Sequence, residues 1–523
     1  MTRAHDAIVV GAGPNGLVAA NLLADRGWSV LLLEQQPQVG GAVASAEDVH
    51  PGFVHDTFSA FYPLGAASPT IRGLDLERHG LTWRHAPAVL GHPLPDGSWA
   101  LLHRDRERTA AGLEARHPGD GEAWLTLCSD WDAVADHLVG ALLTPFPPVR
   151  HGLGLLPRLR KVGGLRFAQT LLTPAVELGR NRFGGEHARI LLAGNAGHAD
   201  IPLTAPGSGL IALLLVMLGQ TVGFPVPEGG AGRLATALRD RFTSLGGEVR
   251  CEAEVTRVVV DRGRATGVRL ADGTSYDARR AVLADVAAPH LFGGLVAADD
   301  LPARVAHGMR GFTMDPGTVK VDWALDRPVP WASPPEVAPG TVHVADSVED
   351  MSESLDQVNA GTVPDRPFML AGQMTTSDPS RSPAGTESLW AYTHVPQGST
   401  HDPADRDRVA DLMQARFERL APGFGDAVLS RRVLGPVDLE ARNANLVGGA
   451  VGGGSAQLHQ QLVFRPVPGL GRAETGIAGL YLASASAHPG GGVHGACGSN
   501  AARAALLHDR VRRLTPSAGR RGR

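Results

Sequence analysis

The sequence predicts an α/β protein whose parallel sheet is assembled from separated segments and which carries a second, mixed α+β domain. The first observation is that residues 7–34 read as strand, tight turn, helix and strand. The second is that a strand, a glycine-rich loop and a helix recur at residues 479–502. The third is length, because 523 residues are too many for one simple core.

The first glycine motif has the pattern that holds a dinucleotide at the start of a helix in a Rossmann fold. Gly11, Gly13 and Gly16 follow an apolar run in the spacing G-x-G-x-x-G. The first permits a sharp turn, the second lets a pyrophosphate approach the backbone, and the third allows close packing of helix on strand. Pro14 and Asn15 open the helix, where free N–H groups and the helix dipole favour anions. We expect these five residues to bind the phosphates.

The residues after the second strand distinguish between FAD and NAD. Glu34 follows Gly16 by about twenty residues, the position of an acid that binds the adenosine ribose. Gly40, Gly41 and Ala42 come shortly afterwards. This acid and glycine pair resemble flavoproteins of the glutathione-reductase-like fold, in which the pair runs beside the pyrophosphate and the ribityl chain. The resemblance favours FAD.

Composition and patterning argue against several classes of partner. The formal net charge of -4 gives no indication of nucleic acid. The three cysteines are far apart, which argues against a redox dithiol and a cysteine-rich metal site, and no metal is expected. The cysteines are expected to be free buried thiols, which fit a reducing cytoplasm, and no signal-peptide pattern is visible. The apolar run 210–218 is too short to span a bilayer and predicts a core helix; the alternative is contact with a membrane or a hydrophobic substrate.

The middle of the chain predicts two departures from the nucleotide domain and a return to it between them. Helices are expected over 124–138, 233–245 and 408–420, and strands over 81–102, 248–284, 319–325, 368–371 and 389–395. Residues 194–200 read as a polar loop, and His55-Asp56 as a structural hydrogen-bonding pair. The glycine-rich run 448–454 is not expected to form a second nucleotide site.

These elements define the expected domains. The FAD-binding domain comprises 1–70, 225–292 and 455–511. The substrate domain comprises 71–224 and 293–454, and residues 512–523 form a basic, disordered tail.

The closing motif carries the most specific resemblance. An apolar strand ends at Ser484, the run His-Pro-Gly-Gly-Gly-Val occupies 488–493, and a helix follows. This pattern resembles the FAD-dependent phytoene desaturase family of amine-oxidase-like flavoproteins. It is most similar to the subgroup of pyridine nucleotide-disulfide oxidoreductase domain-containing proteins. The resemblance extends over nearly the whole chain.

The resemblance implies a glutathione-reductase-like FAD domain and an amine-oxidase-like substrate domain. Val255 would meet the adenine through its backbone, while Ser484, Gly492 and Val493 would lie along the ribityl chain and the flavin ring. Ala42 stands where many relatives have Arg, and the Ser-Ala-Ser at 484–486 replaces a commoner Gly-Ala or Gly-Asp. These departures affect a carotenoid assignment more than FAD binding. The disulfide chemistry in the subgroup's name is not expected, because the chain has no dithiol.

The implied activity is dehydrogenation of a hydrophobic small-molecule metabolite by hydride transfer to flavin N5. Because only one dinucleotide unit is evident, oxygen or a quinone is the expected electron acceptor rather than NAD(P)H. A flavin-dependent isomerase or saturase without net oxidation is one alternative. A second alternative is a non-enzymatic lipid-binding protein of the GDP-dissociation-inhibitor type, because such proteins have a fold related to that of this flavoprotein family.

His494 is the one candidate catalytic residue. It follows Val493 at the start of the closing helix, where the dipole favours a neutral imidazole. As a general base it would contribute about 10²–10⁴ in rate. A loop histidine that only packs or hydrogen-bonds is the alternative.

Overall fold

The first sheet joins strands that are far apart in the sequence. This computed structural model describes residues 4–514. The strand order is β10-β11-β12-β1-β2-β9, with β18 beside β12. β1, β2, β9, the end of β12 and β18 run parallel, whereas β10 and β11 form an antiparallel extension. The strands are β1 Ala4–Val10, β2 Val30–Leu33, β9 Glu248–Arg250, β10 Val255–Asp261, β11 Arg264–Leu270, β12 Ser275–Ala284 and β18 Leu480–Leu482.

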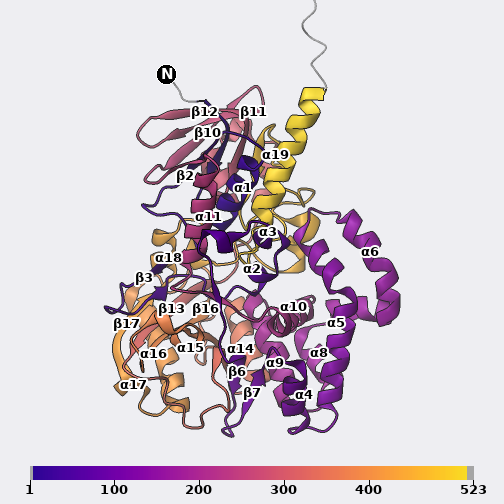
Figure 1. The fold of residues 1–523 in the computed structure, drawn as a ribbon, viewed down its shortest axis with the longest axis vertical. Coiled ribbons are helices and arrows are strands. Elements are labelled where there is room, and N and C mark those ends of the chain that lie inside the picture. The colour runs from indigo at the N-terminus through magenta and orange to yellow at the C-terminus, as the bar shows by residue number, and fades with distance from the viewer. Residues whose placement is uncertain (1–3, 515–523) are drawn as a thin grey trace, which may run out of the picture.

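Successive side chains of β1 point to opposite faces of the sheet and contribute to two different hydrophobic cores. Ala7 and Val9 face a cluster that includes residues of three helices, whereas Ile8 and Val10 face a cluster on the β10–β12 side. The three helices are α1 Pro14–Ala24, α11 Gly232–Ser244 and α19 Ala496–Leu514, and Figure 1 shows them beside the sheet. The predicted Rossmann domain built from separated segments is therefore confirmed; its exact boundaries remain a proposal.

The second sheet has seven strands in the order β17-β13-β16-β15-β14-β6-β7. The strands are β6 Ala88–Pro93, β7 Trp99–Leu102, β13 Gly317–Leu325, β14 Pro339–Val344, β15 Met369–Gln373, β16 Glu387–Val395 and β17 Val428–Leu434. One face packs on α16 Pro403–Leu420 and α17 Phe424–Ala427 (Figure 1). Two further antiparallel sheets have two short strands each. One pairs β3 Ser45–Ala46 with β4 His55–Asp56, and the other pairs β5 Trp83–Arg84 with β8 Val226–Pro227.

A helical layer covers the other side of this sheet near β6 and β7. Its core includes Trp124, Trp131 and Leu213, as the sequence predicts for two buried helices. The helices are α4 Arg106–Glu114, α5 Asp120–Leu143, α6 Val149–Leu159, α7 Leu165–Leu172, α8 Ala175–Arg182, α9 Glu186–Ala196, α10 Ser208–Thr221 and α14 Val348–Asn359. Between residues 4 and 514, none of the helices combines the length and apolarity needed to cross a bilayer.

Three expectations need correction. Residues 194–196 end α9 instead of forming a loop, because the buried amide of Asn195 donates to the Leu191 carbonyl at 2.8 Å and is satisfied within the helix. α16 begins five residues early, since Asp402 caps it by accepting from the Ala404 N–H at 2.8 Å. Residues 512–514 are helical, and the rest of the predicted tail lies outside the described residues.

Candidate functional site

The two glycine motifs meet at the starts of α1 and α19. A Cβ on Gly498 would lie 1.9 Å from the Asn15 carbonyl oxygen, so only glycine allows this contact between the helices. The Gly498 N–H points at the Asn15 Oδ1 at 3.5 Å, across 483 positions of sequence. The N-terminus of a helix favours anions, so two such ends at one place suit a pyrophosphate.

The glycine pair Gly40-Gly41 also lies against the start of α1. A Cβ on Gly41 would lie 2.9 Å from the Gly13 Cα, and the Gly40 N–H donates to the Ala12 carbonyl at 2.9 Å. Gly41 has a φ of +53°, a conformation that favours glycine. Ala42 follows and accepts from the Ser59 hydroxyl at 2.6 Å. The structure thus brings together the two sets of glycines that the sequence assigns to the pyrophosphate.

Glu34 lies at the carboxyl end of β2 and is buried. Its two oxygens accept from the N–H groups of Ala12 at 2.7 Å and Gln36 at 2.9 Å. Burial raises its pKa, although these hydrogen bonds oppose the shift. The Glu34 carbonyl accepts from the Ala253 N–H at 2.8 Å, which places Val255, two residues on, near the same edge of the sheet. Binding of ribose and adenine here remains a prediction.

Asp285 is a buried acid at this site that the sequence analysis missed. It directly follows β12, and its Oδ2 accepts from the Gly16 N–H at 2.8 Å. A Cβ on Gly13 would lie 2.6 Å from the same oxygen. Burial raises the pKa of Asp285 to about 7, and the Glu34 carboxylate adds to the rise. The signal available in the sequence was an acid at the carboxyl end of a parallel strand.

The closing loop continues from β18 toward α19. The Ala483 N–H donates to the Ala284 carbonyl at 2.7 Å, and Ser484 is buried immediately afterwards. Gly492 has a φ of +121° and Val493 a φ of +50°. A β-branched residue in the left-handed region is strained, and such strain gathers at functional sites. Flavin contacts by these three predicted residues remain to be tested.

His494 is buried at the start of α19. Its Nδ1 accepts from the Ala496 N–H at 3.0 Å, so this nitrogen carries no proton. Burial lowers its pKa to about 4, although the backbone at Gly490 and Gly491 opposes the shift. The ring is therefore neutral and caps the helix, which corresponds to the hydrogen-bonding alternative; the predicted role as a base stays untested.

Replacing His494 by Asn separates these two roles. Asn can accept the Ala496 N–H but cannot serve as a base near neutral pH. Because the Nδ1 lone pair is already used by the cap, we expect flavin reduction within about threefold of the parent rate, against a loss of about 10²–10⁴ for a base. Single-turnover stopped flow measures the rate, and Ala at the same position tests the cap. A loss of a hundredfold or more in the Asn variant would establish the base.

FAD affinity is expected to fall as pH rises through about 7, the pKa of Asp285. Below that pH the carboxyl is neutral; above it a carboxylate would face the pyrophosphate, so affinity drops by up to about tenfold per pH unit. Asp285→Asn keeps an acceptor for the Gly16 N–H and stays neutral, so its affinity should be independent of pH. Fluorescence titration of the apoprotein with FAD measures this, with the exposed Asp272→Asn as control. A flat profile for the parent would contradict the expectation.

A polar and aromatic surface on the second sheet faces the helices and loops opposite α16. The register pairs Lys320 with Tyr392, Asp322 with Trp390 and Thr318 with His394, so their side chains share one face. Lys320 pairs with Asp322, and its Nζ lies 5.7 Å from the centroid of the Trp390 ring. Burial raises the pKa of Asp322, but Lys320 and Arg432 hold it below its ordinary value.

Aromatic and imidazole rings extend this surface. The ring centroids of Trp390 and Phe61 lie 6.0 Å apart, and those of the stacked rings of Trp390 and Tyr392 lie 5.9 Å apart. Phe61 belongs to the segment proposed for the nucleotide domain. His394 pairs with Asp200 at 2.5 Å. Burial lowers the pKa of His394, but Asp200 outweighs it and raises the pKa above its ordinary value. We name Phe61, Trp390, Tyr392, His394 and Asp200 the aromatic face.

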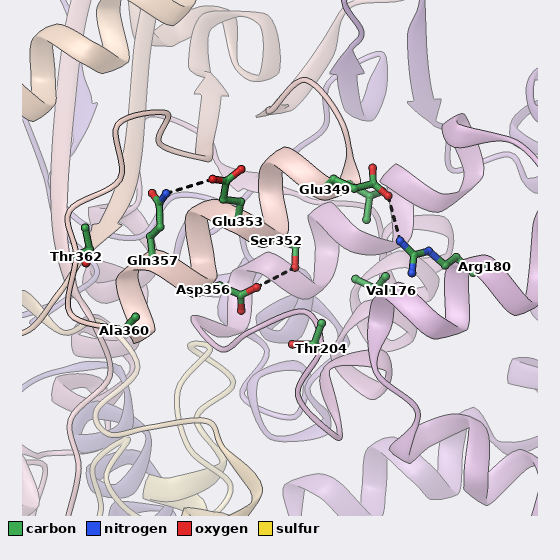
Figure 2. A pocket seen from close by; sticks show the side chains of 11 residues that line it. Val176, Arg180, Thr204, Glu349, Ser352, Glu353, Asp356, Gln357, Ala360 and Thr362 are labelled. Carbon is green, nitrogen blue, oxygen red and sulfur yellow. Dashed lines mark hydrogen bonds and ion pairs between the residues drawn. The ribbon is translucent and has the colours of Figure 1, made fainter.

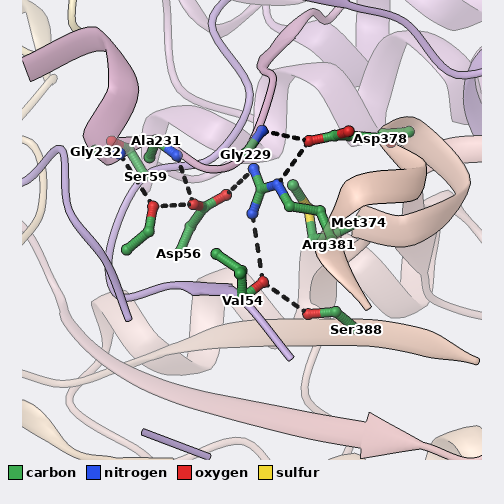
Figure 3. Close-up of polar contacts among 12 residues, drawn as sticks. Val54, Asp56, Ser59, Gly229, Ala231, Gly232, Met374, Asp378, Arg381 and Ser388 are labelled. Atoms are coloured by element: carbon green, nitrogen blue, oxygen red, sulfur yellow. Dashed lines mark hydrogen bonds and ion pairs between the residues drawn. The ribbon is translucent and has the colours of Figure 1, made fainter. Parts of the chain in front are cut away.

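A buried charged cluster ties the two domains together (Figure 3). Arg381 donates to Asp56 at 2.9 Å and to Asp378 at 3.1 Å, and none of the three side chains is more than 1% exposed. Asp56 also accepts from the Ala231 N–H, and Asp378 from the Gly229 N–H, each at 2.7 Å. His55, its predicted partner in a structural pair, donates to the Trp323 carbonyl at 3.1 Å. Both residues make hydrogen bonds within the fold, as expected, but with other partners rather than with each other.

A pocket of about 570 Å³ lies between α8 and α14 (Figure 2). Glu349 and Arg180 pair across it at 3.2 Å, and both are largely exposed. None of the predicted FAD residues lines it. The lining residues are Val176, Arg180, Thr204, Val348, Glu349, Ser352, Glu353, Asp356, Gln357, Ala360 and Thr362. Across residues 4–514, no cluster of three or more His, Cys, Asp or Glu is arranged to hold a metal ion.

The fold and the joined glycine motifs define a flavoprotein oxidoreductase. The family model of flavin-containing amine oxidoreductases matches residues 15–506, and the chain belongs to this family. It is similar to the pyridine nucleotide-disulfide oxidoreductase domain-containing protein 2 of Mus musculus, with 29% identity over 95% of this chain and 92% of that protein. It is also similar to the lycopene-forming phytoene desaturase of Pseudescherichia vulneris, with 26% identity over 96% of this chain and 98% of that protein.

Solved structures agree on the fold. An oxidoreductase from Methanosarcina mazei superposes with a TM-score of 0.63 over 96% of this chain and 99% of that chain, at 15% identity. A putrescine oxidase bound to putrescine gives a TM-score of 0.62 over 98% and 100%, at 17% identity. These similarities confirm the predicted family resemblance, the fold class and FAD as the cofactor.

The residues present fit FAD. Gly13 and Gly41 leave room against the backbone, and α1 and α19 aim two helix starts at the same place. Asp285, whose pKa lies at about 7, can be neutral beside a pyrophosphate at or below neutral pH. Glu34 lies at the end of β2, as a ribose-binding acid does.

Proposed function

We propose that the chain is an FAD-dependent dehydrogenase that desaturates or oxidises a hydrophobic small molecule. The observation that carries the proposal is the meeting of the two glycine motifs at the starts of α1 and α19. The aromatic face supports it, because Phe61 of the segment that follows the nucleotide unit packs near Trp390 there. Bound FAD would supply hydride acceptance at N5. The similarity to phytoene desaturases supports a hydrophobic substrate.

The chain's own residues would bind and orient the substrate. Trp390 and Tyr392 offer stacked ring faces, which favour an apolar molecule. The charge of Lys320 is already matched by Asp322, so the surface presents no free cation to an anionic substrate. The start of α19 would stabilise negative charge on the flavin edge nearest to it. Burial of these groups excludes water from the reacting atoms.

We propose oxygen or a quinone as the electron acceptor. The described residues contain one sheet with the Rossmann arrangement, which FAD would occupy. NADPH is therefore expected to reduce the flavin slowly or not at all. Anaerobic stopped flow with stoichiometric NADPH, followed at the flavin absorbance band, measures this. Rapid bleaching would contradict the expectation and point to a nicotinamide site that the fold does not reveal.

The function itself is tested by anaerobic bleaching with hydrophobic metabolites. A dehydrogenase substrate should bleach the flavin stoichiometrically, and oxygen or a quinone should restore the colour. Conversion of a substrate without net oxidation would instead identify an isomerase. Tight binding of hydrophobic compounds with neither bleaching nor conversion would favour a lipid-binding protein. We also propose a location in the cytoplasm or at a membrane surface. A hydrophobic substrate would dissolve in the membrane itself.

A further inference from the structure

The helical hairpin of residues 149–172 lies at the margin of the substrate domain. It consists of α6, a short turn over Arg160–Val162, and α7. Figure 1 shows α6 at the outer edge, beside α5. No residue of α6 is fully buried. The hairpin is therefore open to its surroundings along its outer side.

Both helices of the hairpin expose apolar side chains. Val149, Leu153 and Leu156 recur three and four positions apart on α6, so they share one helix face. They are 62%, 65% and 60% exposed. On α7, Leu165 and Leu172 are 88% and 57% exposed. We name these five residues the outer stripe.

The inward side of the hairpin is apolar as well. Leu155, Leu159, Val162 and Phe167 pack on the core of the helical layer. Packing therefore explains the inward residues and leaves the outer stripe without a role in the fold. An apolar face of this kind marks a surface that something else covers.

The charge around the outer stripe indicates what covers it. No Asp or Glu occurs between residues 137 and 176, although the whole chain has 53 acidic residues against 49 basic ones. The hairpin instead carries Arg150, Arg158, Arg160, Lys161 and Arg166. Apolar residues flanked by basic ones, without acids, are typical of helices that lie in the interface of an anionic membrane.

We propose that the hairpin of residues 149–172 docks on an anionic lipid bilayer through the outer stripe. The leucines enter the boundary between headgroups and acyl chains, while the arginines and Lys161 contact the lipid phosphates. This surface deepens the proposed function, because a hydrophobic substrate dissolved in the bilayer would reach the protein here. The docking itself does not depend on which reaction the flavin performs.

The entrance to the hairpin is tied to the closing glycine-rich loop. His488, at the start of the His-Pro-Gly-Gly-Gly-Val run, donates to the Thr144 carbonyl at 3.0 Å. Arg472 donates to the Phe146 carbonyl at 3.1 Å. Residues that lead into α6 therefore touch the segment that lies beside the predicted flavin site.

Vesicle flotation tests the docking with the purified FAD-loaded full chain. We expect it to float with vesicles of phosphatidylcholine and phosphatidylglycerol, to bind pure phosphatidylcholine less, and to lose binding at high salt. The double variant Leu153→Gln, Leu165→Gln should lose about tenfold or more in vesicle affinity. Arg158→Gln and Lys161→Gln should each cost about fivefold on the anionic vesicles.

The matched control is Leu245→Gln with Leu429→Gln, two leucines 42% and 47% exposed elsewhere on the chain. It should bind vesicles like the parent, and all variants should keep their flavin absorbance and melting temperature. Failure of the parent to float, or unchanged flotation of the hairpin variants, would overturn the proposal. A parent dimer that the hairpin variants dissociate in sedimentation velocity would also overturn it, in favour of self-association. No substrate is present, so failure here leaves the proposed dehydrogenase activity untouched.

Discussion

Gly13→Glu is expected to give a folded protein that retains no FAD. A Cβ at Gly13 would lie 2.6 Å from the Asp285 carboxylate, and Gly41 packs against the same backbone. The new side chain must therefore turn outward, into the space where the pyrophosphate approaches. It also adds a negative charge beside Asp285 and the phosphates. Both effects act against binding, so the loss should exceed that of any other single change at the site.

Flavin absorbance of the purified protein measures the retention of FAD, and circular dichroism verifies the fold. Gly112→Glu is the matched control, because a Cβ there meets nothing within 4 Å on the exposed side of α4. It adds the same charge and should purify as yellow as the parent. A yellow Gly13→Glu protein would show that FAD binds elsewhere.

Local signals in the sequence were sufficient for the nucleotide domain. The first strand, the three glycines and the helix lie within a short segment, so each element predicts its neighbour. The alternation in residues 319–325 and 389–395 likewise predicted β13 and β16 as strands of one sheet. Short-range periodicity carries this information because successive side chains of a strand point to opposite faces of the sheet. β13 is nevertheless buried on both faces rather than half-buried, because its polar residues lie beneath other segments and pair there, as Lys320 does with Asp322.

Long-range juxtapositions could not be predicted in the same way. Asp285 approaches Gly16 across 269 positions, and Arg381 reaches Asp56 across 325. Nothing in the local sequence tells which distant strand end an acid will meet. The wrong prediction for residues 194–196 has a related cause. Asn195 is typical of loops, and the sequence does not reveal that its side chain donates to the Leu191 carbonyl within a helix. Polar residues are informative only once their partners are known.

The cluster of Arg381, Asp56 and Asp378 has a consequence for the relation of the two domains. Asp56 ends β4, within the segment proposed for the nucleotide domain, and Asp378 and Arg381 lie in the segment proposed for the substrate domain. Backbone N–H groups just before α11 complete the cluster, through Ala231 and Gly229. Each carboxylate is thus fully hydrogen-bonded only while both domains keep their positions. The cluster therefore helps to hold residues 378–381, between β15 and β16, against β4 and the residues just before α11.

Arg381→Met is expected to destabilise the protein by about 3–5 kcal/mol, because it leaves two buried carboxylates without their cation. The methionine fills similar space, so the loss reflects charge more than packing. Denaturant unfolding followed by circular dichroism and flavin fluorescence measures the effect, and flavin release should precede loss of helix if the domain interface opens first.

Arg180→Met provides the comparison on the surface. Arg180 and Glu349 form a pair that is 58% and 67% exposed, and exposed pairs contribute little to stability. The unfolding midpoint of this variant should match that of the parent. Adding Asp56→Asn and Asp378→Asn to Arg381→Met should recover much of the loss, because neutral amides no longer need the cation. Equal midpoints for Arg381→Met and Arg180→Met would show that the buried cluster does not hold the domains together.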